Sequence, residues 1–383
     1  MNYQFKDNVL TLFFKGEINS VNAGDIEKEV EPVLKKEPFS SLVLDFTNLT
    51  YISSAGLRIV LKMKQRCANT SVIGCSLTVY DILEMTGFTN IMTVSKALKS
   101  ISVEGAEVVG SGYFSTVYRI DKDTIVKVFN RVSDPEQVER ELSRAKEAFI
   151  LGIPTAISYD IVKVGEKLGV RFEMLDCDSL RNVFRDNPNR YDEFLEKYAN
   201  LLHTINSTEP TSKSLSQIKN DYKRKLEVVK TAFTDEEYRK LSAMINGIPD
   251  ALTFVHGDCH VKNIMVQNDE LLLIDMDTLS VGDPIFEYAA IYAAYIGFEE
   301  NEPGNSRVFF GLEPDFTRKL AHDLIRKAYG RDDQETLDKI ALLCFLHMAW
   351  WTTANEPENT RNFEFRINNV KKRLAILDNL IIK

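Results

Sequence analysis

The spacing of apolar and polar positions divides the chain near residue 102. Before it, apolar runs over 9–14 and 41–46 predict β-strands, and helical spacing predicts helices over 23–35 and 55–66. The second run is nearly continuous in apolar residues, which is typical of a strand buried on both faces. Strands and helices therefore alternate, and we expect a small α/β domain over residues 1–102.

After residue 102 the pattern changes to strands around one helix, and then to mostly helical spacing. The helix is predicted from Asp134 to Leu151, with Asp134-Pro135 as its cap and first-turn proline. Apolar residues over 340–347 continue into Trp350-Trp351. This stretch predicts core packing and, as a second interpretation, an aromatic cage for a quaternary amine.

The residues most informative about chemistry are His256-Gly257-Asp258-Cys259-His260-Val261-Lys262-Asn263, followed by an apolar strand pattern that ends at Asp275. Phosphoryl transfer needs a carboxylate to orient and deprotonate a hydroxyl, and an amide and a second carboxylate to hold magnesium. Asp258, Asn263 and Asp275 supply these groups in the chain order of a kinase catalytic loop and metal-binding segment. The motif therefore predicts a kinase-like site.

A nucleotide-binding segment is expected upstream of this motif. Gly110 and Gly112 lie in a glycine-rich turn between apolar segments, and glycines let a hairpin backbone approach phosphates closely. Lys127 lies in a β-branched strand pattern over 124–129, from which it could reach the α and β phosphates. Glu141 is the expected ion-pair partner of Lys127, because it shares a helix face with Ala145 and Phe149; Glu139 is the alternative.

The adenine is expected to stack against a hinge over 172–176, where an apolar strand runs into polar residues. Glu173 and Leu175 are the hinge residues expected to contact ATP.

Residues of about 105–383 resemble the aminoglycoside phosphotransferase and choline kinase group of small-molecule kinases. The marks are His256-Gly257-Asp258, His260 and Gly282-Asp283-Pro284. The resemblance implies an α+β bilobal protein-kinase-like domain over 103–383, with an N-lobe of about 103–176 and a C-lobe of about 177–383. It implies ATP and Mg²⁺ as cofactors, with Asp258 as catalytic base, Asn263 and Asp275 as magnesium ligands and Lys127 as a phosphate contact.

The same resemblance gives His256 and Asp283 supporting roles around the loop. Asp277 is either a residue behind the metal ligands or a solvated strand end. Members of the group phosphorylate aminoglycosides, macrolides, choline, sugars and amino-acid-like alcohols, so the fold does not choose the acceptor. The acidic run 299–302 would suit a cationic substrate, although a solvated loop is the simpler interpretation.

The first domain carries a second resemblance. The stretch 42–57, which ends in Ile52-Ser53-Ser54-Ala55-Gly56-Leu57, and the later 82–88 resemble the sulfate-transporter and anti-sigma-antagonist (STAS) domain, an α/β fold. In signalling members a serine at the start of the helix is phosphorylated, and the motif places it at Ser54. Ser53 stands where several of these members have Asp. A plain serine N-cap is the alternative interpretation of Ser54.

Composition limits the remaining choices. With 383 residues, two domains are expected, and a formal charge of −9 argues against a nucleic-acid-binding surface. Five cysteines without CxxC spacing suggest neither a disulfide framework nor a zinc site. The sequence has no apolar run near twenty residues and no signal-peptide pattern, so we expect a cytoplasmic protein without membrane association.

These patterns predict a STAS-like domain fused to an ATP-dependent kinase that phosphorylates a hydroxyl of a small molecule. The alternatives are a nucleotide-binding signalling scaffold and a kinase that acts on a STAS-domain serine. A protein partner is expected through the STAS-like surface, and the short joint over 99–105 is compatible with regulation between the domains or with a homodimer.

Overall fold

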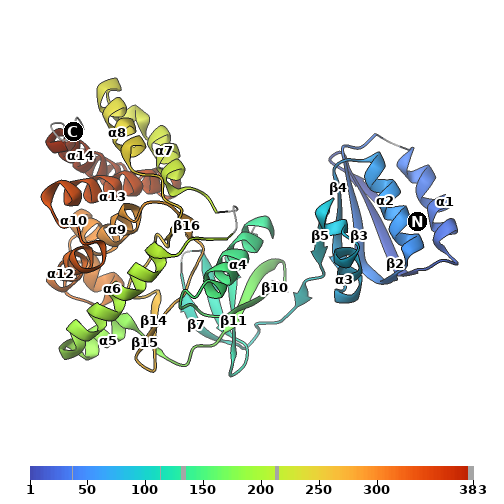
Figure 1. Cartoon of the computed structure of the whole chain (residues 1–383), viewed down its shortest axis with the longest axis horizontal. Coiled ribbons are helices and arrows are strands. Elements are labelled where there is room, and N and C mark those ends of the chain that lie inside the picture. Colours follow the sequence, from blue (N-terminus) through green and yellow to red (C-terminus); the bar gives the residue numbers. More distant parts are fainter. Residues whose placement is uncertain (37, 113, 131–134, 212–214, 378–383) are drawn as a thin grey trace. The chain divides into compact units, whose positions relative to one another are not determined.

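The chain forms two compact units, Met1–Ser102 and Val103–Lys383. The computed structural model describes residues 1–36, 38–112, 114–130, 135–211 and 215–377 (Figure 1). Each unit encloses its own hydrophobic core.

The described part of the first unit is a five-stranded sheet with helical crossovers. The strand order is β1-β2-β3-β4-β5, in which β1 is antiparallel to β2 and the other neighbours are parallel. Parallel neighbours need a crossover, and one helix supplies each of the three. The elements are β1 (Asn2–Lys6), β2 (Val9–Ile18), α1 (Ala23–Leu34), β3 (Ser41–Ile52), α2 (Ser54–Arg66), β4 (Thr70–Cys75), α3 (Leu77–Met85), η1 (Phe88–Asn90), β5 (Thr93–Lys96) and β6 (Lys99–Ser100).

Several boundaries differ from the sequence prediction, and the strand expected over 9–14 continues as β2 to Ile18. The strand expected over 41–46 continues as β3 to Ile52, because Asn48, Leu49, Tyr51 and Ile52 pair with the end of β2. Helix α2 then begins at Ser54, one residue earlier than predicted. Its N-cap is Ser53, whose Oγ accepts the N–H of Gly56 at 3.4 Å.

The second unit begins with an antiparallel sheet that runs in the order β10-β11-β9-β8-β7. Helix α4 packs on β10 and β11, and Val138, Phe129 and Val170 form a small core there. The elements of this region are β7 (Glu107–Ser111), β8 (Ser115–Arg119), β9 (Thr124–Phe129), α4 (Pro135–Ile150), β10 (Ser158–Val164) and β11 (Lys167–Glu173). Asp134, the predicted helix cap, lies outside the described residues.

The rest of the second unit is mostly helical and holds the main core. Helix α13 packs against α14, α9 and α7, and α13 and α14 lie side by side (Figure 1). Every residue from Ile340 to Leu346 is buried, so the predicted core packing is confirmed.

The elements of this helical region are β12 (Asp178–Ser179), α5 (Leu180–Asp186), η2 (Pro188–Arg190), α6 (Tyr191–Ser207), α7 (Ile218–Val228), η3 (Lys230–Ala232), α8 (Asp235–Gly247), β13 (Phe254–Val255), β14 (Ile264–Gln267), β15 (Glu270–Leu273), β16 (Ser280–Val281), α9 (Ile285–Tyr292), η4 (Ala293–Gly297), α10 (Phe298–Asn301), α11 (Asn305–Phe310), α12 (Pro314–Leu324), η5 (Ile325–Tyr329), α13 (Gln334–Asn355) and α14 (Thr360–Leu377).

Candidate active site

The loop over 256–263 follows the short strand β13, and helix α9 fixes its backbone. The Glu287 side chain is fully buried, and its carboxylate accepts the backbone N–H groups of His256 (2.5 Å) and Gly257 (3.2 Å). The Tyr295 hydroxyl accepts the N–H of Val261 at 2.9 Å. The backbone of the loop is therefore held by buried groups, and the side chains of Asp258, His260, Lys262 and Asn263 line a pocket.

Asp258 lies at the centre of this loop. Asn263 Nδ2 donates to Asp258 Oδ2 at 2.9 Å, and His260 Nε2 lies 3.6 Å from Asp258 Oδ1. The Asp258 side chain is 45% exposed, and this exposure opens into a protein-walled pocket. Partial desolvation there, together with the charge of Asp275, raises the pKa of Asp258 to about 7. The carboxyl can therefore both accept and release a proton near neutral pH.

Asp275, Lys127 and Glu141 form one ion-pair network. Lys127 Nζ on β9 lies 2.7 Å from Glu141 Oε1 on α4 and 2.7 Å from Asp275 Oδ1, two residues beyond β15. Burial would lower the pKa of Lys127, but Asp275 and Glu141 outweigh it and hold the pKa above its usual range. Glu141 is thus the partner of Lys127, whereas Glu139 is exposed.

The backbone at Asp275 is strained. Its φ is +69°, a left-handed conformation that a residue with a Cβ adopts at a cost of about 1–3 kcal/mol. Such strain is retained where the surrounding structure and the function require it. Here the conformation places the Asp275 carboxylate beside the ammonium of Lys127.

The donor set beside Asp258 suits Mg²⁺. The Asn263 amide nitrogen faces Asp258, so its carbonyl oxygen is the atom free to bind a cation, and Asp275 adds a carboxylate. Mg²⁺ prefers hard oxygen ligands and is usually held by one or two carboxylates plus phosphates and water. Among the described residues, no group of three or more His, Cys, Asp or Glu side chains is arranged to hold a metal ion.

The glycine-rich segment forms the turn of the β7–β8 hairpin. Gly110 pairs with Val117, and Gly112 donates its N–H to Ser115 O at 2.9 Å. Asn130 closes the turn by donating to Gly112 O at 3.2 Å and accepting from Thr116. Gly112 lines the pocket that contains Asp258.

The expected hinge residues lie elsewhere in the second unit. Glu173 ends β11, and its Oε1 accepts the N–H of Ile157 at 2.7 Å. Leu175 follows this strand and is partly buried. Neither residue lines the pocket around Asp258, so their contact with adenine stays a prediction.

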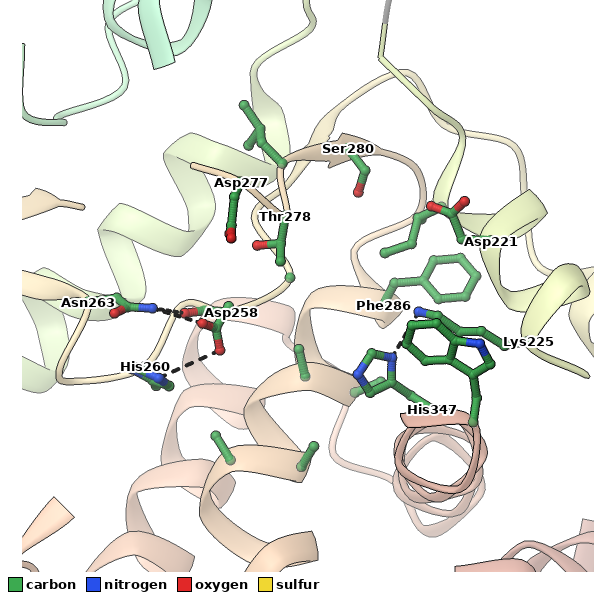
Figure 2. Close-up of a pocket in the computed structure, with 18 of the residues that line it drawn as sticks. Asp221, Lys225, Asp258, His260, Asn263, Asp277, Thr278, Ser280, Phe286 and His347 are labelled. Carbon is green, nitrogen blue, oxygen red and sulfur yellow. Dashed lines mark hydrogen bonds and ion pairs between the residues drawn. The ribbon is translucent and has the colours of Figure 1, made fainter. Parts of the chain in front are cut away.

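The pocket has a volume of about 1090 Å³ and two chemically different ends. Figure 2 shows Asp258, Asn263 and His260 at one end, and Lys225, His347 and Phe286 at the other. Helices α7, α9 and α13 supply much of the second end. Ligand pockets usually enclose about 300–1000 Å³, so this one is at the large end of that range.

The residues expected to support the loop have distinct contacts. His256 Nδ1 accepts the backbone N–H of Asp258 at 3.3 Å, and Asp283 Oδ1 accepts that of Ile285 at 2.9 Å. Burial lowers the pKa of His256 to about 4, so its ring is neutral.

Asp277 exposes its side chain into the pocket, and partial burial and the charge of Asp275 raise the pKa of Asp277 to about 7. Its carbonyl accepts from Arg144 at 2.6 Å.

The acidic run 299–302 does not line the pocket. Glu299 is buried, and its carboxylate accepts the N–H groups of Gly304 (2.6 Å) and Ser306 (2.8 Å). Glu302 accepts from Asn362 at 2.7 Å. The run therefore stabilises its own region, and neither a cation site nor a simple solvated loop describes it.

Two residues of the site were not predicted from the sequence: Glu287, which holds the loop backbone from outside the pocket, and Lys225, which lines the pocket. Glu287 is a single carboxylate in the apolar helix Ile285-Phe286-Glu287-Tyr288-Ala289, and such an isolated charge could have indicated a buried anchor. Lys225 lies in the strongly charged helix α7, where nothing in the spacing separates it from solvated neighbours. Its position becomes visible only when α7 packs against α13.

Ser54 belongs to the first unit. It is the first residue of α2 and is exposed. Because Ser53 occupies the N-cap, the interpretation of Ser54 as a plain N-cap is wrong. Its phosphorylation stays a prediction.

No helix among the described residues is both long and apolar enough to cross a membrane. All five cysteines have free thiols, and four of them are buried.

Comparison with known families gives two matches that together span most of the chain. The model described as "Phosphotransferase enzyme family" matches residues 105–322, and the model described as "STAS domain" matches residues 1–101. A curated relative, the putative anti-sigma factor antagonist BtrV of Bordetella bronchiseptica, is 35% identical over 95 residues, which are 24% of this chain and 81% of that protein.

Solved structures with a similar arrangement include three aminoglycoside phosphotransferases. ADP-bound APH(2'')-Ib is 15% identical with a TM-score of 0.48, covering 70% of this chain and 91% of its own. The GDP and kanamycin complex of APH(2'')-IIIa is 12% identical with a TM-score of 0.49, covering 77% and 98%. APH(3'')-Id from Streptomyces rimosus is 16% identical with a TM-score of 0.45, covering 65% and 93%. The family matches agree with both resemblances drawn from the motifs.

Proposed function

Because the chain belongs to the phosphotransferase enzyme family and carries a STAS domain before it, we propose that it transfers the γ-phosphate of ATP to a hydroxyl of a small molecule. The observation that supports this most strongly is the network in which Lys127 bridges Glu141 and Asp275. Together with Asp258 and Asn263, it provides each polar group that phosphoryl transfer requires. We place the boundary between the two lobes near residue 176, and the activity in the cytoplasm.

In this proposal the Lys127 ammonium binds the α and β phosphates and the glycine-rich turn covers them. Asn263 Oδ1 and the Asp275 carboxylate would hold Mg²⁺, which supplies positive charge to the β and γ phosphates. Release of Lys127 from Asp275 is part of nucleotide binding, since both groups would then contact the nucleotide or its metal.

Asp258 acts on the acceptor. Its carboxylate accepts the hydroxyl proton as the hydroxyl oxygen forms a bond to the γ-phosphorus, while the bond from that phosphorus to the β–γ bridging oxygen breaks and ADP leaves. The hydrogen bond from Asn263 orients the carboxylate for this step. A raised pKa suits a general base that works near neutral pH.

A coupled ADP-release assay on pooled hydroxyl metabolites with Mg²⁺ and ATP tests the proposal. We expect acceptor-dependent ADP formation that falls by about 10²- to 10⁴-fold in Asp258→Ala, the usual contribution of a general base. ATP affinity should stay within a few fold, because Asp258 contacts the acceptor.

The alternative of a nucleotide-binding scaffold predicts a different result. A scaffold would bind ATP tightly and show no acceptor-dependent ADP formation with any pool. The full Lys127, Asp258, Asn263 and Asp275 set favours the enzyme, because a scaffold does not need a base.

A further inference from the structure

Lys225 occupies the end of the pocket away from Asp258 (Figure 2). Its Nζ lies 4.6 Å from the ring centre of Tyr222 and 5.1 Å from that of Trp350, and 2.8 Å from His347 Nδ1. Tyr222 is on α7 with Lys225, whereas His347 and Trp350 lie one turn apart on α13. The ammonium is therefore held at a fixed position by two helices.

This cation has no acidic partner among the described residues. Its polar neighbour is the His347 ring, and burial lowers the pKa of that ring well below its usual range, so the ring is a neutral acceptor. The charged residue that acts on Lys225 is Arg224, which has the same sign. Asp221 lies nearby in the pocket but is engaged by Arg224 and Ser216.

A charge in this position costs free energy. Burying an ammonium without a counter-ion is unfavourable, and burial lowers the pKa of Lys225 to about 8. A structural lysine would normally pair with a carboxylate or extend to water. The position is understandable if a bound molecule brings the missing negative charge.

The same contacts argue against a cationic acceptor. An aromatic cage attracts a quaternary amine through its ring faces, but the Tyr222 and Trp350 rings already face the Lys225 ammonium. Four cationic residues line the pocket, against three carboxylates. Two of these carboxylates, Asp258 and Asp277, lie beside the proposed phosphate site. Asp221 is therefore the one carboxylate at the acceptor end, where Arg224 and Lys225 both lie. The acceptor end is thus net positive.

We propose that the acceptor is a small anion, whose hydroxyl meets Asp258 and whose carboxylate or phosphate pairs with Lys225, against the apolar surface of Phe286 and Trp350. This inference rests on the proposed phosphotransferase function. An acidic pocket would select polyamines. This pocket would disfavour them, because like charges juxtaposed in a desolvated site are strongly unfavourable.

Ligand-observed NMR on the full-length protein tests the assignment. The library contains four sets of hydroxyl compounds: carboxylates, phosphate monoesters, neutral polyols, and amines that include choline and kanamycin. Dissociation constants of the strongest ligands are then measured for wild type, Lys225→Met and Lys225→Arg. Lys223→Met is the matched control, because Lys223 is exposed on the same helix and does not line the pocket.

We expect the strongest ligands to be anions, and the carboxylate and phosphate sets distinguish the two sources of charge. Their affinity should fall about 10- to 100-fold in Lys225→Met, the value of a hydrogen bond to a charged group, and much less in Lys225→Arg and Lys223→Met. Lys225→Gln serves as the second variant if thermal unfolding shows that Lys225→Met does not fold.

Three results would overturn the assignment: strongest ligands that are neutral or cationic, no binding by any anion, or anion affinity unchanged in the folded Lys225 variants. A parallel titration with Mg²⁺ and ATP separates this failure from that of the proposed function. If ATP binds and choline or kanamycin is the strongest ligand, only the acceptor class is wrong. If ATP does not bind, the phosphotransferase proposal itself fails.

Discussion

At the scale of single residues, the position of Lys127 between two carboxylates has the clearest consequence. We predict that Lys127→Ala weakens ATP binding about 10- to 100-fold with or without metal, through loss of a charged contact to phosphate. Asp275→Asn should instead abolish the strengthening of ATP binding by Mg²⁺, because one carboxylate of the metal site becomes a neutral amide. Isothermal titration calorimetry with and without Mg²⁺ measures both effects.

Lys163→Ala, an exposed lysine on β10 of the same sheet, is the control for this experiment. Removing Lys127 also leaves Glu141 buried without its partner, so the unfolding temperature of each variant is measured alongside. Equal ATP affinity in folded wild type and both variants would place the nucleotide site elsewhere.

Lys225 gives a prediction about pH. Since burial lowers its pKa to about 8, the ammonium needed to pair with an anion is present below that pH and is lost above it. The two titratable side chains that contact the Lys225 ammonium keep their state in this range, because burial holds the pKa of His347 well below its usual range and raises that of Tyr222 above its usual range. The dissociation constant of an anionic acceptor should therefore rise as pH increases through about 8.

The same titration of Lys225→Arg is the control, since a guanidinium stays protonated throughout. A pH dependence that is identical in wild type and Lys225→Arg would exclude Lys225 as its source.

The sequence could predict those site residues whose chemistry is tied to a local pattern. Asp258, Asn263 and Asp275 follow one another at fixed spacing, and Glu141 could be chosen from the helix face it shares with Ala145. Lys225 could not be predicted, because its surroundings come from α13, more than a hundred residues away. Glu287 could be predicted only in part. The sequence shows a single charge in an apolar helix, but it does not show which backbone N–H groups that charge accepts.

At the scale of elements, the close packing of α2 on its sheet can be tested. A Cβ on Gly56 would lie 2.7 Å from both Ile18 Cγ2 and Ile52 Cγ1, so the helix cannot approach the sheet as closely with any other residue. We predict that Gly56→Ala destabilises the first unit by about 1–3 kcal/mol, the usual cost of overpacking. Thermal unfolding of the full chain measures this change.

Gly24→Ala is the matched control, because Gly24 lies on α1 and its Cβ would meet nothing within 4 Å. It should be stabilising by about 0.5–1 kcal/mol, as expected for alanine in a helix. Equal effects of the two substitutions would contradict the close packing of α2.

Element boundaries show what the apolar pattern alone does not determine. The strand predicted over 41–46 continues to Ile52, because pairing with β2 extends it through the polar residues Thr47, Asn48 and Thr50. Helix α13, in contrast, is apolar on nearly all sides over 340–346 and is central to the core, so its burial followed from composition. The extension of β3 comes from pairing with another strand, which the local spacing of apolar residues does not encode.

At the scale of the whole molecule, the STAS domain raises the question of regulation. Ser54 is exposed at the first turn of α2, and a phosphate there would add close to two negative charges near a helix N-terminus, which favours them. We predict that Ser54→Asp changes the set of proteins bound in a pull-down, that Ser54→Ala retains the unmodified set, and that both fold.

Ser53→Ala tests the structural alternative separately, because Ser53 is the residue that caps the helix; its loss should cost about 1 kcal/mol of stability. Identical partners for the Ser54 variants, together with no phosphate on the native protein by intact mass, would remove Ser54 as a regulatory site.

In the proposed reaction, Asp258 acts as the base that promotes transfer of the γ-phosphate of ATP to a small molecule. The most direct measurement is untargeted mass spectrometry of a metabolite extract incubated with Mg²⁺, ATP labelled with ¹⁸O in its γ-phosphate, and either the wild type or Asp258→Ala. We expect a labelled phosphate on a small hydroxyl compound with the wild type and none with the variant. Equal labelling by both proteins, or label found only on protein, would contradict it.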